Sequence, residues 1–260
     1  MPHQPVIRPD KPVRVVFDAS SHSKNEYSLN DCLYSGPNLN PPLLEILIQF
    51  RTHGVAFTAD IEQAFVQISL SPEDKDAVRF LWANNLTDKD GKPNMKRLRM
   101  TRVLFGATSS PFLLASTIKH HIDTFKETNQ KAVKLLNKCL YVDDLIGGDE
   151  DENEVKLIYE DIRYILKASG FNMRKWETNC AICRKFLMNK KMVKSRKFWN
   201  RRYWDIKNYK EDLLKIESQN LTNQAQEETK LMTKREVLKT IGKLYDPIGF
   251  ISPFTIRAKY

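Results

Sequence analysis

The sequence predicts an α+β fold, because strand-like and helix-like segments alternate along its 260 residues. The runs 55–61 and 139–146 are short and apolar, as expected for buried strands, and Gly147-Gly148 indicate a turn after the second run. The segments 112–122 and 152–168 carry apolar residues at helical spacing instead. With 41% hydrophobic residues, a chain of this length can bury the core of one or two domains.

Local patterns predict the other elements. Strands are expected at 13–17, 78–82 and 98–103, a helix at 43–50, and a polar loop at 84–94. Pro111 is a favoured first residue for the 112–122 helix. The acidic residues at 149–152 and 154 crowd the start of the 152–168 helix, where the helix dipole favours negative charge. We therefore interpret them as helix electrostatics and not as metal ligands.

Asp143 and Asp144 are the most informative pair of residues. They lie in the tetrapeptide 141–144, YVDD, between apolar neighbours. Buried, unpaired charge is strongly disfavoured, but a divalent cation can neutralise two carboxylates, and Mg²⁺ binds carboxylate and phosphate oxygens. The alternative interpretation of the tetrapeptide alone is a solvated acidic turn.

Asp60 is a third candidate ligand. It ends another apolar strand-like run, and a turn or cap residue is the alternative interpretation. If the two strands are neighbours, three carboxylates can hold two Mg²⁺ ions about 3.5–4 Å apart, which clamp both oxygens of an in-line phosphoryl displacement. Mn²⁺ is expected to substitute for Mg²⁺.

Three ordered blocks resemble motifs A, B and C of reverse transcriptases: 57–65, 102–111 and 141–144. More narrowly, the chain resembles the polymerase domain of BEL/Pao-type LTR retrotransposons. The narrower resemblance rests on blocks at 5–10, 14–20, 28–33, 36–39 and 245–249. It covers roughly residues 5–179 and 205–260.

The resemblance implies a right-hand polymerase with a βαββαβ-like antiparallel palm sheet, fingers and a truncated thumb. It divides the chain into fingers (1–54), palm with motif A (55–77), a fingers/palm excursion (78–104) and palm with motifs B, C and D (105–180). A divergent basic segment with a primer-grip-like remnant (181–230) and the start of the thumb (231–260) follow. Thr233 and Glu236 form a capping-box pattern at the start of the expected thumb helix.

The resemblance also assigns site residues. Arg14 matches the arginine that contacts the incoming triphosphate, and Phe65 matches the aromatic gate against the ribose 2′-hydroxyl. Phe105 and Gly106 match the segment behind the nucleotide and template base, although Leu104 replaces the usual proline. Without the resemblance, Arg14 is a solvated strand residue and Phe65 a core residue.

Lys175 follows a motif D-like segment and is a candidate general acid, together with catalytic Asp60, Asp143 and Asp144. A solvated surface lysine is the alternative interpretation of Lys175. The implied substrates are deoxynucleoside triphosphates and an RNA or DNA template with its primer. The rest of a Pol polyprotein, with protease, RNase H and integrase, is expected outside this chain.

Residues 184–210 contain eleven Lys or Arg, one acid and six aromatic residues. Cations that neutralise phosphates and aromatic rings that stack on bases are typical of nucleic-acid-binding surfaces. We therefore regard Lys190, Lys191, Arg196 and Lys197 as candidate nucleic-acid contacts. The family resemblance fails over 180–203, so a decayed or inserted stretch is the alternative.

The net charge of +10 indicates a polyanionic partner. No apolar run approaches the ~20 residues needed to cross a membrane, and residues 1–3 do not resemble a signal peptide. We expect no membrane partner and an intracellular, cytoplasmic location, inside a virus-like particle by resemblance. The four cysteines are expected to be reduced, and the Cys180/Cys183 spacing lacks the second ligand pair of a zinc site.

Two other functions remain open at this point. A catalytically decayed or co-opted remnant would bind nucleic acid without polymerising it, and the short thumb and basic stretch favour that interpretation. An RNA-dependent RNA polymerase shares the aspartate pattern, but an aromatic residue at Phe65 disfavours it.

Overall fold

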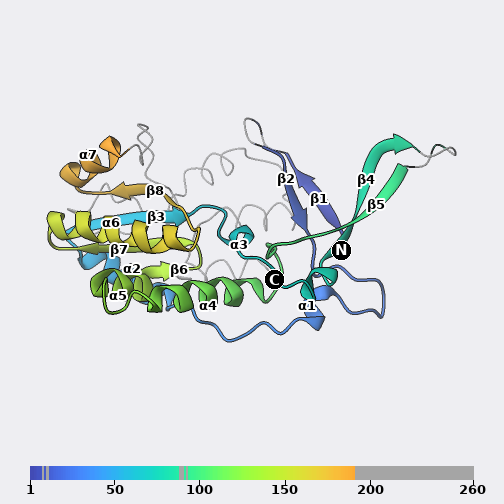
Figure 1. Ribbon diagram of the computed structural model, residues 1–260, viewed down its shortest axis with the longest axis horizontal. Helices are drawn as coiled ribbons and strands as arrows, with labels where there is room; N and C mark the ends of the chain where they lie inside the picture. The colour runs from blue at the N-terminus through green and yellow to red at the C-terminus, as the bar shows by residue number, and fades with distance from the viewer. Residues whose placement is uncertain (8, 10–11, 88–90, 92, 191–260) are drawn as a thin grey trace, which may run out of the picture.

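The computed structural model describes residues 1–7, 9, 12–87, 91 and 93–190. Its centre is a four-stranded antiparallel sheet of order β6-β7-β3-β8, called the palm sheet below (Figure 1). Its strands are β3 (Val55–Ile61), β6 (Leu140–Tyr141), β7 (Asp144–Asp149) and β8 (Met173–Thr178). Helices separate β3 from β6 and β7 from β8, so the predicted α+β class and βαββαβ order are confirmed.

The palm sheet packs against a core on each of its two faces. The side chains of β3 alternate between these faces. Val55, Phe57, Ala59 and Ile61 belong to the main core, whereas Ala56 belongs to a second, smaller core. Each face therefore needs its own cover of helices.

The longer helices that supply buried residues to the main core are α4 (Ser110–Asp123), α5 (Gln130–Cys139), α6 (Glu152–Ala168) and α7 (Ala181–Asn189), and the short helix at 64–67 adds Ala64 and Phe65. On the other face, Ile46 and Phe50 of α2 (Leu43–Thr52) pack with Ile146 of β7. Thus α2, which the sequence-based division assigns to the fingers, packs on the palm sheet.

The predicted amphipathic helices are present. The expected apolar face of α6 is buried, with Tyr159 in addition, and Asp151 caps the helix by accepting a hydrogen bond from the Asn153 amide at 2.7 Å. Pro111 lies in the first turn of α4, as predicted. These matches show that local periodicity was sufficient to predict α4 and α6.

Two local predictions were wrong. Gly147 and Gly148 do not form a turn but lie inside β7, where they pair with Phe57 and Ala56. A Cβ atom on Gly148 would lie 2.5 Å from the Val55 carbonyl oxygen, so the close approach of two backbones explains this glycine. The expected polar loop at 84–94 is also shorter, since strands reach Thr87 and Pro93.

Two hairpins lie apart from the palm sheet, toward the other end of the view in Figure 1. One consists of β1 (His3–Val6) and β2 (Arg14–Phe17), and the other of β4 (Arg79–Thr87) and β5 (Pro93–Arg99). Their contact is aromatic, with ring centroids 5.0 Å apart for Phe17 and Phe80. Two four-residue helices, α1 (Leu29–Cys32) and α3 (Ala64–Gln67), and a 3-10 helix (Asp74–Asp76) complete the described part.

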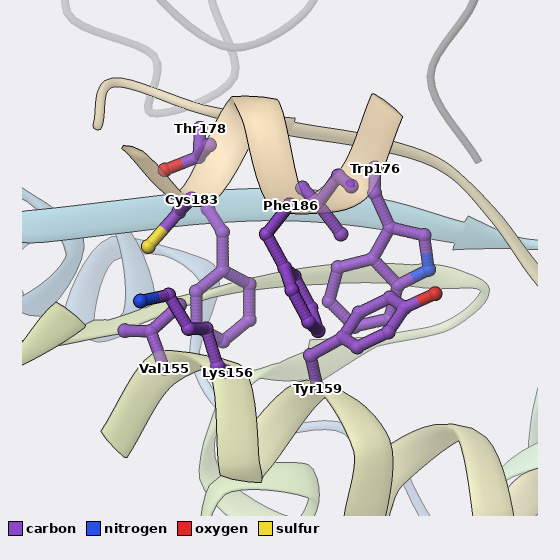
Figure 2. A pocket seen from close by; sticks show the side chains of 9 residues that line it. Val155, Lys156, Tyr159, Trp176, Thr178, Cys183 and Phe186 are labelled. Atoms are coloured by element: carbon purple, nitrogen blue, oxygen red, sulfur yellow. The ribbon is translucent and has the colours of Figure 1, made fainter. Parts of the chain in front are cut away.

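The start of the stretch without family resemblance forms α7. Figure 2 shows Cys183 and Phe186 of α7 facing Val155 and Tyr159 of α6 across a narrow apolar crevice. Cys183 and Leu187 are buried. Residues 181–189 are therefore packed against the main core through Cys183 and Leu187. The expected thumb helix and primer-grip remnant lie outside the described residues.

Candidate active site

The pairing of β3 with β7 places the three residues that carry the predicted ligand carboxylates at adjoining strand ends. Asp60 lies opposite Asp144 in the register of the two strands. The Ile61 amide donates a hydrogen bond of 2.8 Å to the Asp143 carbonyl, which fixes the turn before β7 against the end of β3. By the alternation of β3, Asp60 shares its face with Ala56, which packs with Ile46 and Phe50 of α2.

Asp143 lies in a tight turn between β6 and β7. Tyr141 pairs with Asp144, which leaves Val142 and Asp143 as a two-residue connection. Val142 has a φ of 57°, a left-handed conformation that β-branched residues rarely adopt. A positive φ at the first central residue alone is the feature of type II′ hairpin turns, where glycine is usual.

Lys175 reaches Asp60 through a β-bulge. Between β3 and β8, the register advances two residues from Thr58 to Asp60 but three residues on β8. Lys175 lies in this bulge with a φ of 55° and forms an ion pair with Oδ2 of Asp60. Bulges redirect side chains near active sites, and this one places an ammonium group at the carboxylates.

The second oxygen of Asp60 has a different environment. Oδ1 is buried and accepts no hydrogen bond, and its nearest ion-pair partner is Nε of Arg174 at 4.0 Å. Arg174 in turn forms an ion pair with Glu62, to which Asn172 also donates a hydrogen bond of 2.8 Å. A buried carboxylate oxygen without a donor has unused capacity to coordinate a cation.

The donor set suits Mg²⁺, which prefers carboxylate oxygens. Within the residues that the structure describes, however, no three side chains of His, Cys, Asp or Glu converge closely enough to hold an ion. Lys175 supplies positive charge to Asp60 in this arrangement. The backbone thus assembles the predicted ligands, while the Asp60 side chain is paired with a lysine.

The predicted nucleotide-binding residues form a second group. The rings of Phe65 and Phe105 pack edge to face, with centroids 4.7 Å apart. Phe65 is buried, but the Phe105 side chain is 57% exposed. Gly106 has a φ of 91°, and a Cβ atom there would approach the Phe17 carbonyl to 3.3 Å. Both the conformation and the space therefore favour glycine.

Asn30 holds the segment around Gly106, a role that the sequence did not indicate. Its Nδ2 donates to the Gly106 carbonyl at 3.0 Å and to Ser20 Oγ at 2.8 Å. Its Oδ1 accepts from the Thr108 amide at 2.9 Å. These partners lie far from Asn30 in the sequence or in irregular backbone, so no local pattern could reveal them.

Other predicted residues are less closely tied to the carboxylates. Arg14 begins β2 and is exposed in the described structure. Lys190 forms an ion pair of 2.8 Å with Glu160 and lies 5.6 Å from the Phe186 ring centroid. The other three predicted nucleic-acid contacts, Lys191, Arg196 and Lys197, lie outside the described residues.

The Cys180/Cys183 pair is part of a helix cap. The Sγ atom of Cys180 accepts a hydrogen bond of 3.3 Å from the Cys183 amide at the start of α7. Burial raises the pKa of the Cys183 thiol to about 12.

Comparison with protein families decides the assignment. The family "Reverse transcriptase (RNA-dependent DNA polymerase)" matches residues 14–230. The chain belongs to this family. The family is named for RNA-dependent DNA polymerisation, and the matched residues include Asp60, Asp143 and Asp144. No curated protein matches the sequence.

Solved structures agree with the fold. A foamy viral protease-reverse transcriptase in complex with RNA/DNA hybrid matches 92% of this chain and 26% of its own, at 18% identity and a TM-score of 0.55. A foamy viral protease-reverse transcriptase dRH in complex with double-stranded DNA matches 92% of this chain and 34% of its own, at 19% identity and a TM-score of 0.53. The chain thus spans about a third or less of these structures.

These comparisons confirm the predicted polymerase fold and family. The BEL/Pao subtype, the domain boundaries and the residue roles stay predictions. In the part of the chain that the structure describes, no helix has the length and apolar character to cross a membrane.

Proposed function

We propose that this chain is the polymerase part of a retrotransposon reverse transcriptase, of the BEL/Pao type that its sequence blocks resemble. It would add deoxynucleotides to a primer 3′-hydroxyl on an RNA or DNA template. The observation that carries the proposal is the register that pairs Asp60 with Asp144 and places Asp143 in the adjoining turn. The family to which the chain belongs is named for this reaction.

Asp60, Asp143 and Asp144 would hold two Mg²⁺ ions, or Mn²⁺ in their place, and bound ions supply charge stabilisation for both oxygens of the phosphoryl displacement. The unused Oδ1 of Asp60 supports this assignment. Lys175, whose ammonium already contacts Asp60, would donate its proton from Nζ to the pyrophosphate leaving group.

The other predicted residues would bind the nucleotide. Arg14 would contact the triphosphate, because guanidinium groups pair with phosphates in a bidentate manner. Phe65 would exclude the ribose 2′-hydroxyl, and its ring packs edge to face on that of Phe105. Gly106 would let the backbone approach the base pair, since it carries no Cβ atom.

Nucleic acid and further protein domains are the inferred partners. The two foamy viral structures were solved with double-stranded DNA and with RNA/DNA hybrid, which supports a template–primer duplex as ligand. Those proteins are named protease-reverse transcriptases, which supports a protease in the same polyprotein. RNase H and integrase are further parts of a Pol polyprotein that the BEL/Pao resemblance implies. A cytoplasmic particle is the location that the resemblance implies.

Primer extension on poly(rA)/oligo(dT) with Mg²⁺ tests the proposal. We expect the wild-type chain to extend the primer, Asp143→Asn to lose at least about a hundredfold in rate, and the surface variant Asp123→Asn to match wild type. Asp123 is an exposed residue at the end of α4. Duplex binding without extension by wild type would contradict the proposal and favour a nucleic-acid-binding remnant. Extension with ribonucleotides alone would indicate an RNA polymerase.

A further inference from the structure

The turn that carries Asp143 adopts a conformation that its own sequence disfavours. Val142 is β-branched and has a φ of 57°, whereas β-branched residues rarely adopt the left-handed region. Such backbone conformations persist when the surrounding structure fixes them. Part of the fold outside the hairpin must therefore hold this turn.

Asn40 provides one such contact, in addition to the hydrogen bond that the Ile61 amide of β3 donates to the Asp143 carbonyl. Oδ1 of Asn40 accepts a hydrogen bond of 3.1 Å from the Val142 amide, across 102 residues of sequence. Both side chains are partly buried. Without Asn40, the Val142 N–H would lose this acceptor. The hydrogen bond therefore acts on the residue whose backbone is strained.

The amide of Asn40 has a fixed orientation. Its Nδ2 donates to Asn38 Oδ1 at 3.3 Å, and its backbone N–H donates to the same oxygen at 3.0 Å. Because the amino group faces Asn38, the carbonyl oxygen faces Val142. The side chain is thus oriented as an acceptor for the turn.

The segment that contains Asn40 is anchored at both ends. Upstream, Gly36 packs so closely on Phe112 of α4 that a Cβ atom would lie 2.3 Å from its ring. Downstream, Pro42 precedes α2, whose Ile46 and Phe50 pack with Ile146 of β7. Asn40 therefore connects the Asp143 turn to two helices that already contact the palm.

We propose that Asn40 is a positioning residue, which holds the Val142–Asp143 turn so that Asp143 and Asp144 are directed toward Asp60. The inference rests on the proposed function, since it concerns the same carboxylates. Asn40 acts through the turn and does not touch the substrate. Its neutral amide also adds no charge beside the carboxylates, which an aspartate at this position would do.

The test compares Asn40→Ala with Asn153→Ala, which removes the same side chain from the exposed first turn of α6. Two properties are measured: Mn²⁺ affinity by electron paramagnetic resonance, and kcat and KM for single-nucleotide incorporation. We expect Asn40→Ala to weaken Mn²⁺ binding and lower kcat by about tenfold or more, as for other residues that orient metal ligands. We expect its KM for nucleotide, its duplex affinity and its Tm to stay near wild type.

Asn38→Ala gives an independent check, because it frees the Asn40 amide without removing it. We expect the same direction of change with a smaller size. Wild-type Mn²⁺ affinity and kcat in Asn40→Ala would overturn the inference, and so would an equal loss in Asn153→Ala. A fall in Tm with a parallel loss of duplex binding would also overturn it, because it would indicate a general structural role. If wild type binds Mn²⁺ but incorporates no nucleotide, the proposed function fails, and Mn²⁺ affinity alone decides the role of Asn40.

Discussion

The palm sheet and the two hairpins beside it are built in different ways. In the palm sheet, β3 is paired on both sides and packs against a core on each face. The hairpins are two-stranded, and Val15, Val16 and Leu81 are exposed on them. Two-stranded sheets are marginally stable on their own, so the hairpins depend on their aromatic contact. The predicted ligand carboxylates thus lie on the sheet that has a core on both faces, whereas the hairpins expose much of their apolar surface.

The largest expected difference is in stability. Phe57 is 2% exposed and packs on Trp176 with centroids 5.7 Å apart, so Phe57→Ala should lower the free energy of unfolding by about 3–5 kcal/mol. Phe80 contacts His3, Phe17 and Trp82 at the hairpins and is only partly buried. Phe80→Ala should lower the free energy of unfolding by less than half as much as Phe57→Ala. Urea unfolding measures both, and equal losses would remove the distinction between the two regions.

The next expected difference is kinetic. Lys175→Ala should lower kcat by about a hundredfold, because it removes a positioned proton donor, with little change in the KM for nucleotide. Arg14→Ala, in β2, should mainly raise that KM, because it removes a contact to the triphosphate. Pre-steady-state incorporation separates the two effects. A KM effect for Lys175→Ala alone would show that the lysine binds substrate without donating a proton.

A third expected difference concerns sugar selectivity at the boundary between the regions. Phe65 packs on the exposed Phe105, so Phe65→Ala should open space beside the ribose and improve use of ribonucleotides about tenfold relative to deoxynucleotides. Competition between the two nucleotides on one template measures this ratio. Unchanged selectivity with lower stability would show that Phe65 is only a core residue.

The smallest expected effect is chemical reactivity. Cys32 is exposed, whereas Cys183 is buried against α6. Burial raises the pKa of Cys183 to about 12, so little thiolate exists at pH 8. Iodoacetamide should label Cys32 in the native protein and Cys183 only after unfolding. Early labelling of Cys183, located by mass spectrometry, would mean that α7 detaches readily.

The sequence predicted what depends on local pattern or on short motifs. The long helices, β3 and the three carboxylates were predicted because apolar spacing and two aspartate-bearing strands are visible without the fold. Helix α5 was overlooked, although Ala132, Val133, Leu136 and Cys139 have helical spacing and are buried. The spacing of these four residues is therefore sufficient to predict α5.

Contacts between distant segments could not be predicted in this way. The bulge that directs Lys175 to Asp60 has no signal in the sequence of the segment 173–178. Glycine is the usual sign of a positive φ, but lysine occupies this position. The two glycines of β7 led to the opposite error, because a turn was predicted where they allow close backbone packing inside a strand. The contact of Asn40 with Val142 spans 102 residues and leaves no local trace.

Metal binding by the three carboxylates is the central claim, and Mn²⁺ titration followed by electron paramagnetic resonance tests it most directly. The titration compares wild type with Asp60→Asn, Asp143→Asn and the control Asp123→Asn. The account predicts that each of the two site variants weakens Mn²⁺ binding by about tenfold or more and that the control matches wild type. Equal Mn²⁺ affinity in all four proteins would contradict it.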